Sequence, residues 1–146
     1  MTERAAAEGL DFRFDLAQSG NTFDAHRLVH LAATYGHQAA AEERLMRAYF
    51  TEGAAISDPE TLIALMTEVG VDVDEARDVL SGDRFAEDVR EDEQLAGQLG
   101  IQGVPFFVID RRLGVSGAQP PDALVQALER AWSEAISGES RAAAPG

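Results

Sequence analysis

The residues that suggest chemistry most directly lie in the stretch Leu99–Val108 (Leu-Gly-Ile-Gln-Gly-Val-Pro-Phe-Phe-Val). Gly100 ends a predicted helix, Gly103 loosens the following loop, and Pro105 opens an apolar strand. Proline cannot donate a hydrogen bond to a sheet, so it belongs at the start or the edge of a strand. A cis bond before Pro105 is possible where tertiary contacts enforce it. Taken alone, this pattern is typical of an ordinary connection between a helix and a strand.

Two histidines form a second candidate group. His26 and His30 are four residues apart, which places them on one helical face with Phe23 and Ala33. This spacing suits either a pair of metal ligands or a polar patch that faces a substrate. A metal site requires at least a third ligand and supporting hydrogen bonds, so packing or capping is the favoured role. We therefore predict no metal site.

Asp92 interrupts an apolar helical stripe and is the third candidate. The stripe consists of Phe85, Val89, Ala96 and Leu99. A carboxylate in such a stripe must be paired, hydrogen-bonded or at the edge of the core. The favoured interpretation is an edge position that leans into solvent. The alternative is a buried acid that tunes a nearby site, with Arg27 or His30 as its partner.

The composition of the 146 residues excludes several classes of function. Twenty-six acidic residues against twelve basic ones give a formal charge of −14, which repels phosphate backbones and anionic lipids. We therefore expect neither nucleic-acid nor membrane binding. The basic residues are all Arg, and the chain has no Cys. Lysine and thiol nucleophiles, disulfides and thiolate metal sites are thus excluded, and no cofactor is predicted. The first residues lack the pattern of a signal peptide, which predicts a cytoplasmic location.

Glycine, proline and helix-capping residues divide the chain into predicted elements. Helices are expected at 2–8, 21–35, 39–51, 59–69, 74–80, 83–99 and 120–136. Alternating polarity predicts a short extended segment at 11–15. Strands at 105–110 and 115–116 are joined by a turn at 111–114, and the small, polar tail 138–146 is expected to fray.

Three patches in this order resemble the FrnE-like branch of the DsbA family. The first is Asn21-Thr22 followed by Ala25–Leu28 (Ala-His-Arg-Leu), the second is Leu99–Val108, and the third is Ser116–Gln119 (Ser-Gly-Ala-Gln). The middle patch occurs in many thioredoxin-like proteins, whereas all three together are far more specific. The resemblance covers the whole chain except its tail.

The resemblance implies a site for an extended substrate. Pro105 matches the cis-proline that lies beside the redox centre of the family, and Gly103 belongs to the same loop. The backbone of Val104 would hydrogen-bond a substrate segment. His26 and Arg27 match a helix that faces the active-site side, so a substrate-binding role is implied for them as well.

The implied fold is α/β and mostly helical. A helical insertion domain at 1–99 is followed by the C-terminal half of a thioredoxin-like, DsbA-type fold (strand, turn, strand, helix) at 100–137, and then by a flexible tail at 138–146. The family's N-terminal strands and its redox helix with Cys-x-x-Cys lie upstream of anything matched, and are expected to be missing. No catalytic residue is therefore assigned in this chain.

Three functions are compatible with these residues. The first is a truncated or degenerate DsbA/FrnE-like thiol–disulfide oxidoreductase that keeps the cis-proline, peptide-binding side. The second is the related glutathione-dependent isomerase branch, which acts on 2-hydroxychromene-2-carboxylate. The third is a non-catalytic binding or assembly protein. Because strand 106–110 would have an open edge, we also expect a homodimer, a domain swap or a partner chain that covers it.

Overall fold

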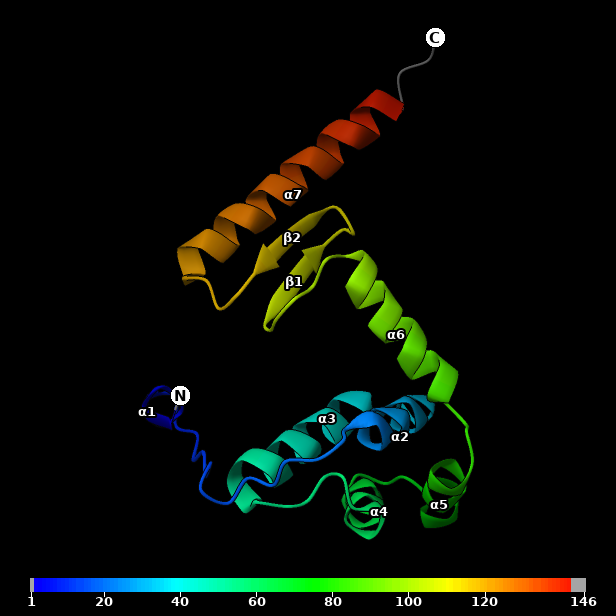
Figure 1. Cartoon of the computed structure of the whole chain (residues 1–146). Coiled ribbons are helices and arrows are strands. Elements are labelled where there is room, and N and C mark those ends of the chain that lie inside the picture. The colour runs from blue at the N-terminus through cyan, green and yellow to red at the C-terminus, as the bar shows by residue number, and fades with distance from the viewer. Residues whose placement is uncertain (1, 143–146) are drawn as a thin grey trace. The chain divides into compact units, whose positions relative to one another are not determined.

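The computed structural model describes residues 2–142, with side chains described for residues 2–136. The chain divides into two compact units, Met1–Glu93 and Gln94–Gly146 (Figure 1). The first unit is helical, and the second contains a two-stranded sheet and a long helix. The structure is thus mostly helical with a small sheet, which confirms the predicted fold class.

The first unit is built from short helices joined by tight turns. In chain order they are α1 (Thr2–Ala7), α2 (Phe23–Thr34), α3 (Gln38–Arg47), η1 (Ala48–Glu52), α4 (Pro59–Glu68) and α5 (Val73–Ser81). Helix α6 (Ala86–Gln98) begins in this unit and ends in the next one. Several helices end at a glycine. Gly36 and Gly70, for example, follow α2 and α4 with φ angles of 74° and 87°. Positive φ is a conformation that glycine adopts without steric cost.

Helix α2 lies at the centre of the first unit and packs against α3, α4 and α5. Five large side chains are fully buried there, namely Leu28, Leu31, Leu62, Met66 and Val79. Burying one such side chain contributes roughly 1.5–3 kcal/mol. The buried side chains therefore determine which face of α2 packs in the core. The remaining α2 side chains point outward as a consequence.

The predicted helix at 39–51 is wrong in its last turn. The α-helix α3 ends at Arg47, and the chain continues as the π-helical turn η1 up to Glu52. Gly53 closes this turn in the left-handed conformation, with φ 67°. A π-turn inserts one residue into the helical repeat and leaves no clear sequence signature. Here it places Phe50 against the N-terminal segment.

The predicted extended segment at 11–15 forms no strand, and its last two residues, Phe14 and Asp15, belong to a turn. The rings of Phe12 and Phe50 stack with centroids 4.7 Å apart, and Phe14 meets Phe50 edge to face at 5.8 Å. The backbone N–H of Arg13 donates to the carbonyl of Phe50 at 2.7 Å. The alternation of apolar residues therefore reflects aromatic packing on η1 and not pairing in a sheet.

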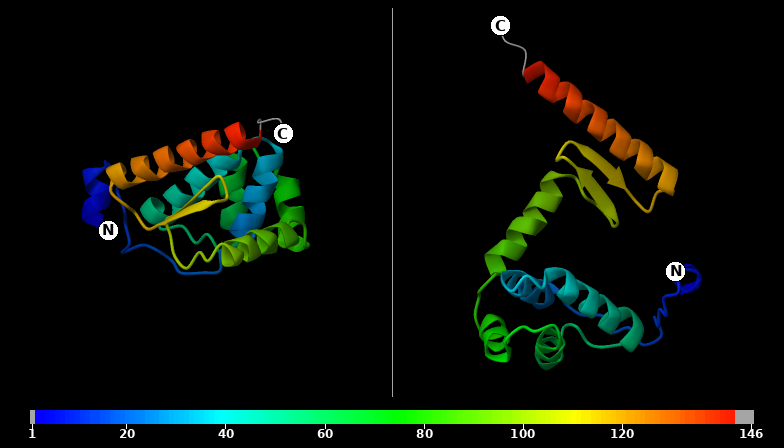
Figure 2. Two further views of the ribbon diagram at one scale, coloured as in Figure 1. Left: turned by 90° about the horizontal axis from the view of Figure 1, so that it is seen from above. Right: turned by 180° about the vertical axis from the view of Figure 1, so that it is seen from behind.

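The second unit contains the hairpin of β1 (Phe106–Ile109) and β2 (Leu113–Ser116), followed by α7 (Pro121–Ala142). The strands are antiparallel, with Phe107 opposite Val115. Helix α7 packs against β2, as the views in Figure 2 show.

The hairpin turn differs from its predicted position. It lies at residues 110–112, and β2 is longer than expected. The N–H of Arg112 donates to the carbonyl of Ile109, and the two residues between them, Asp110 and Arg111, both have positive φ. Positive φ at both central residues defines a type I′ turn. Such turns normally contain Asn-Gly or Asp-Gly, so the Asp-Arg sequence does not indicate this one.

Helix α7 also extends beyond its predicted end, to Ala142. The rest of the tail, predicted to fray, lies outside the described residues. Among the residues that the structure describes, no helix combines the length and the apolar character required to cross a bilayer.

Candidate functional site

The loop before β1 presents its backbone to the outside. Val104 is the most exposed large apolar residue in the described part of the chain, at 91%. The backbone groups of Val104 make no hydrogen bond within the described part of the chain. The Val104–Pro105 peptide bond is cis. A Cβ atom built on Gly103 would meet nothing within 4 Å, so the loop is open on that side as well.

Pro105 connects this loop to the hairpin. Its carbonyl accepts a hydrogen bond from the N–H of Gly117 at 2.8 Å, directly before β1 pairs with β2. Proline thus stands at the start of a strand, where its missing N–H costs nothing. The arrangement anchors one end of the loop and leaves the N–H and C=O of Val104 available. Free backbone groups of this kind can hydrogen-bond an extended peptide.

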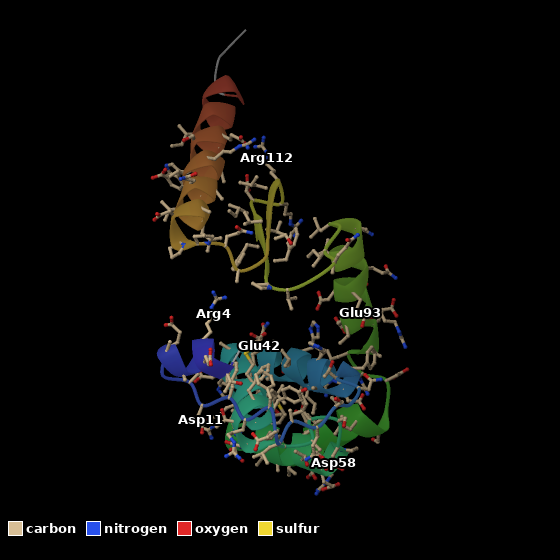
Figure 3. The ribbon with its side chains drawn as sticks, turned by 60° about the vertical axis from the view of Figure 1, so that its left-hand side comes forward. Arg4, Asp11, Glu42, Asp58, Glu93 and Arg112 are labelled. Carbon is tan, nitrogen blue, oxygen red and sulfur yellow. The ribbon has the colours of Figure 1, made fainter. Side chains whose placement is uncertain are left out.

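His26 lies in the other unit, on the exposed side of α2. It lines a largely apolar hollow of about 570 Å³. The hollow is formed mainly by α2, α3 and η1, and Val29, Leu45, Met46 and Tyr49 are among its lining residues. Glu42 on α3, labelled in Figure 3, also lines it and accepts a hydrogen bond from the side chain of Gln38.

Arg27 does not fit the substrate-contact role that its position in the sequence suggested. Its side chain is buried, with 5% exposure, and Nη1 pairs with Asp24 at 2.8 Å. The other guanidinium nitrogens donate to the backbone carbonyls of Arg84, at 3.0 Å, of Gly82, at 2.7 Å, and of Val79. Arg27 of α2 therefore binds the C-terminal end of α5 and the loop that follows it. Four of the five N–H groups of its guanidinium donate within the fold, and the buried side chain is held away from a substrate.

Asp92 is exposed, so the alternative of a buried acid is wrong. Its side chain is 69% exposed, and Oδ2 lies 3.0 Å from Nε2 of His30. His30 was one of the two partners considered, whereas Arg27 pairs with Asp24 instead. The ring of His30 also stacks on Phe85, with centroids 6.2 Å apart. The pair is a surface contact between α2 and α6.

His26 and His30 belong to no metal-binding group in the structure. Within the described residues, no cluster of three or more His, Asp or Glu side chains could hold a metal ion. The two side chains have different surroundings, since His26 borders the hollow and His30 meets Asp92 and Phe85.

Sequence reasoning missed the hollow beside His26. Its wall includes Tyr49 and Phe50 of η1, and the π-turn that positions them was not foreseeable. A sequence signal did exist in the apolar residues Leu45, Met46, Tyr49 and Phe50, which are more numerous than one buried helical stripe requires. Met46 remains 60% exposed in the structure.

Comparison with known proteins agrees with this architecture. A family model described as a DSBA-like thioredoxin domain matches residues 1–129. The crystal structure of a probable DsbA oxidoreductase from Streptomyces coelicolor is similar, with a TM-score of 0.85 and 45% sequence identity. The similarity covers 91% of this chain but 58% of that one, so the chain spans little more than half of that relative. No curated protein matches the sequence. Because the family model covers most of the chain, the protein belongs to the family of DSBA-like thioredoxin domains.

Proposed function

We propose that this chain is a FrnE-like member of the DsbA family that binds extended peptides through the Val104–Pro105 loop. The three sequence patches support the FrnE-like branch. The similarity to a probable DsbA oxidoreductase supports a role in thiol–disulfide exchange. The single observation that carries the peptide-binding role is that Val104, a residue 91% exposed, makes no backbone hydrogen bond in the described chain.

The proposed role of these 146 residues is binding and not electron transfer. Thiol–disulfide exchange proceeds by attack of a thiolate on a disulfide sulfur, and the sequence contains no cysteine. The thiols of a complete reaction must therefore come from outside these residues. What the chain supplies is a surface that holds the polypeptide substrate in an extended form, through main-chain hydrogen bonds that do not depend on the substrate's sequence.

His26 is the second residue that we assign to substrate binding. It is exposed, and it borders a hollow lined mostly by apolar side chains. A hollow of this kind can accept an apolar side chain, while the imidazole supplies one polar contact. The His26→Ala variant tests this part of the proposal independently of the Val104 loop.

Two variants of Val104 separate a backbone contact from a side-chain contact. The Val104→Ala variant keeps the N–H and removes most of the apolar side chain. The Val104→Pro variant removes the N–H donor. The probe is a fluorescein-labelled, cysteine-free, unfolded peptide, and binding is measured by fluorescence anisotropy. We expect saturable binding by the unmodified chain, nearly the same Kd for Val104→Ala, and a roughly tenfold or larger loss for Val104→Pro, which corresponds to about 1.4 kcal/mol.

The same titration can contradict the proposal. If the peptide does not bind saturably, or if both Val104 variants bind like the unmodified chain, the loop is not the binding site. A parallel titration with glutathione addresses the isomerase branch. Saturable binding of glutathione without binding of the peptide would overturn the peptide-binding role in favour of that branch.

A further inference from the structure

The hollow beside His26 has an acidic side chain on its wall. Among the residues that the structure describes, Glu42 of α3 is the only acidic one that lines the hollow, and no arginine lines it. Glu42 is exposed, and its carboxylate accepts a hydrogen bond from the amide of Gln38 at 2.9 Å. The two oxygens of a carboxylate can accept about four hydrogen bonds. One amide therefore leaves most of this capacity for a ligand.

The two arginines of α3 pair with other carboxylates. Arg44 lies 2.7 Å from Glu68, and Arg47 lies 2.9 Å from Glu52. Glu42 forms no ion pair within the described part of the chain. The wall of the hollow therefore carries a negative charge that the fold does not neutralise.

The charge of the whole first unit has the same sign. Residues 1–93 contain 21 acidic and eight basic residues, whereas residues 94–146 contain five acidic and four basic ones. The excess of negative charge thus lies almost entirely in the unit that contains the hollow. Such a charge distribution attracts cationic ligands and repels anionic ones before contact. Glu42 can turn this general attraction into a specific contact.

An extended peptide can place two side chains at the hollow together. Successive side chains of an extended chain point to opposite sides, so residues two positions apart project to the same side, roughly 6.6–6.8 Å from each other. One apolar side chain can then enter the hollow while the side chain two positions away meets its wall. A long basic side chain suits that wall, because its apolar stem can pack on apolar surface while its charged end reaches a carboxylate.

Met46 provides the apolar surface for such a stem. It follows Glu42 by four residues on α3, so the two side chains are neighbours on one face of the helix. Met46 also lines the hollow and is 60% exposed. An arginine lying along Met46 would present its planar guanidinium to the carboxylate of Glu42, a geometry that allows two parallel hydrogen bonds.

We propose that the hollow selects peptide segments in which a basic residue lies two positions from an apolar one. The apolar side chain enters the hollow, and Glu42 binds the basic side chain. An acidic residue at the same position would be repelled. This inference rests on the proposed peptide-binding function and names the class of substrate segment that the chain prefers.

Three fluorescein-labelled peptides test this preference. Each has one leucine in a serine-rich, cysteine-free sequence, and the positions two residues before and after the leucine are both arginine, both glutamine or both glutamate. Binding is measured by fluorescence anisotropy at about 0.15 M salt, where charges more than about 8 Å apart are largely screened. We expect the arginine peptide to bind about fivefold more tightly than the glutamine peptide, and the glutamate peptide to bind most weakly.

Glu43 provides a matched control for Glu42. Both are exposed residues of α3, but Glu43 is not among the residues that line the hollow. Glu42→Gln should reduce the preference for arginine over glutamine to less than about twofold, whereas Glu43→Gln should retain it. The charge-reversed variant Glu42→Arg should prefer the glutamate peptide. Because this variant is still strongly negative overall, its reversed preference could not arise from the net charge.

The outcomes separate this inference from the proposed function. Equal Kd values for the arginine and glutamine peptides would overturn the selection of basic segments but leave peptide binding intact. Equal effects of Glu42→Gln and Glu43→Gln would also overturn it, because the preference would then come from the overall charge. If none of the three peptides binds, both the inference and the proposed function are wrong.

Discussion

Nε2 of His30 and Oδ2 of Asp92 lie 3.0 Å apart and join α2 to the middle of α6. The carboxylate is largely in solvent, and the imidazole is 30% exposed. Water competes for both groups at such a site, and exposed pairs of this kind contribute little to stability. The contact therefore links two helices without making the fold depend on it.

The first prediction concerns the energy of this contact. In a double-mutant cycle with His30→Ala and Asp92→Ala, we expect a coupling energy below about 1 kcal/mol. The measurement is urea unfolding followed by circular dichroism. A coupling energy of about 3 kcal/mol would contradict the exposed position of Asp92, because couplings of that size are found at buried charge pairs.

The second prediction concerns Arg27, whose buried guanidinium holds three backbone carbonyls and Asp24. The Arg27→Met variant keeps much of the apolar volume but leaves these acceptors without their donor. We expect the free energy of unfolding to fall by about 3 kcal/mol or more, since unpaired buried polar groups are costly. Arg27→Lys should restore only part of the loss, because an ammonium cannot reach all the acceptors of the planar guanidinium.

Arg77 provides the control for Arg27. It also lies on the first unit, but its side chain is exposed, and its ion pair with Asp74 is long, at 3.7 Å. The Arg77→Met variant is expected to change stability by less than about 0.5 kcal/mol. If the two Arg→Met variants were equally stable, Arg27 would not hold the carbonyls as the structure shows.

Local sequence signals predicted the elements whose boundaries depend on neighbouring residues. Asp58 and Pro59 indicated the start of α4, and the side chain of Asp58 does accept a hydrogen bond from the N–H of Thr61. Gly36 indicated the end of α2. These signals act within one helical turn, so they can be recognised without knowledge of the tertiary structure.

Features that depend on distant contacts could not be predicted in this way. The burial of Arg27 results from carbonyls more than fifty residues later in the chain. The π-turn η1 is accompanied by the stacking of Phe50 on Phe12, and the same contact explains why the alternating segment at 11–15 is not a strand. For the candidate site, the sequence indicated the Val104–Pro105 loop but not the hollow beside His26.

The third prediction is a pH dependence due to Asp58. Hydrogen bonds from the backbone N–H and the hydroxyl of Thr61 lower the pKa of this carboxyl below its ordinary value. A group whose pKa is lowered on folding stabilises the fold at a pH above its unfolded pKa. This stabilisation is lost as the pH falls through the folded pKa. The melting temperature should therefore decrease with acidification, roughly from pH 5 to pH 2.

The Asp58→Asn variant isolates this effect from helix capping. Asparagine also caps helices, but its amide does not titrate in this range. We expect the variant to show a smaller decrease in melting temperature over the same pH interval, and Asp58→Ala to be less stable at neutral pH because the cap is lost. Identical pH profiles for the unmodified chain and Asp58→Asn would show that Asp58 does not contribute.

The last prediction concerns Gly53, which closes the π-turn. Its φ of 67° favours glycine, and a Cβ atom at this position would lie 2.6 Å from Cβ of Leu16. Gly36 has a similar φ of 74°, but a Cβ atom there would meet nothing within 4 Å. Gly36→Ala therefore reports the backbone cost alone, about 1 kcal/mol. Gly53→Ala carries the same cost and the steric clash in addition.

The difference between the two variants measures how firmly the N-terminal segment is held against η1. We expect Gly53→Ala to be less stable than Gly36→Ala by roughly 1–3 kcal/mol in urea unfolding, which is the usual cost of overpacking. The amide of Gln18 also donates to the carbonyl of Gly53 at 2.8 Å, so a shift of Leu16 would disturb a second contact. Equal stability of the two variants would contradict this prediction, because it would mean that the segment around Leu16 can move away from η1. Gln18, which follows Leu16 and lines the hollow, would then not be held rigidly.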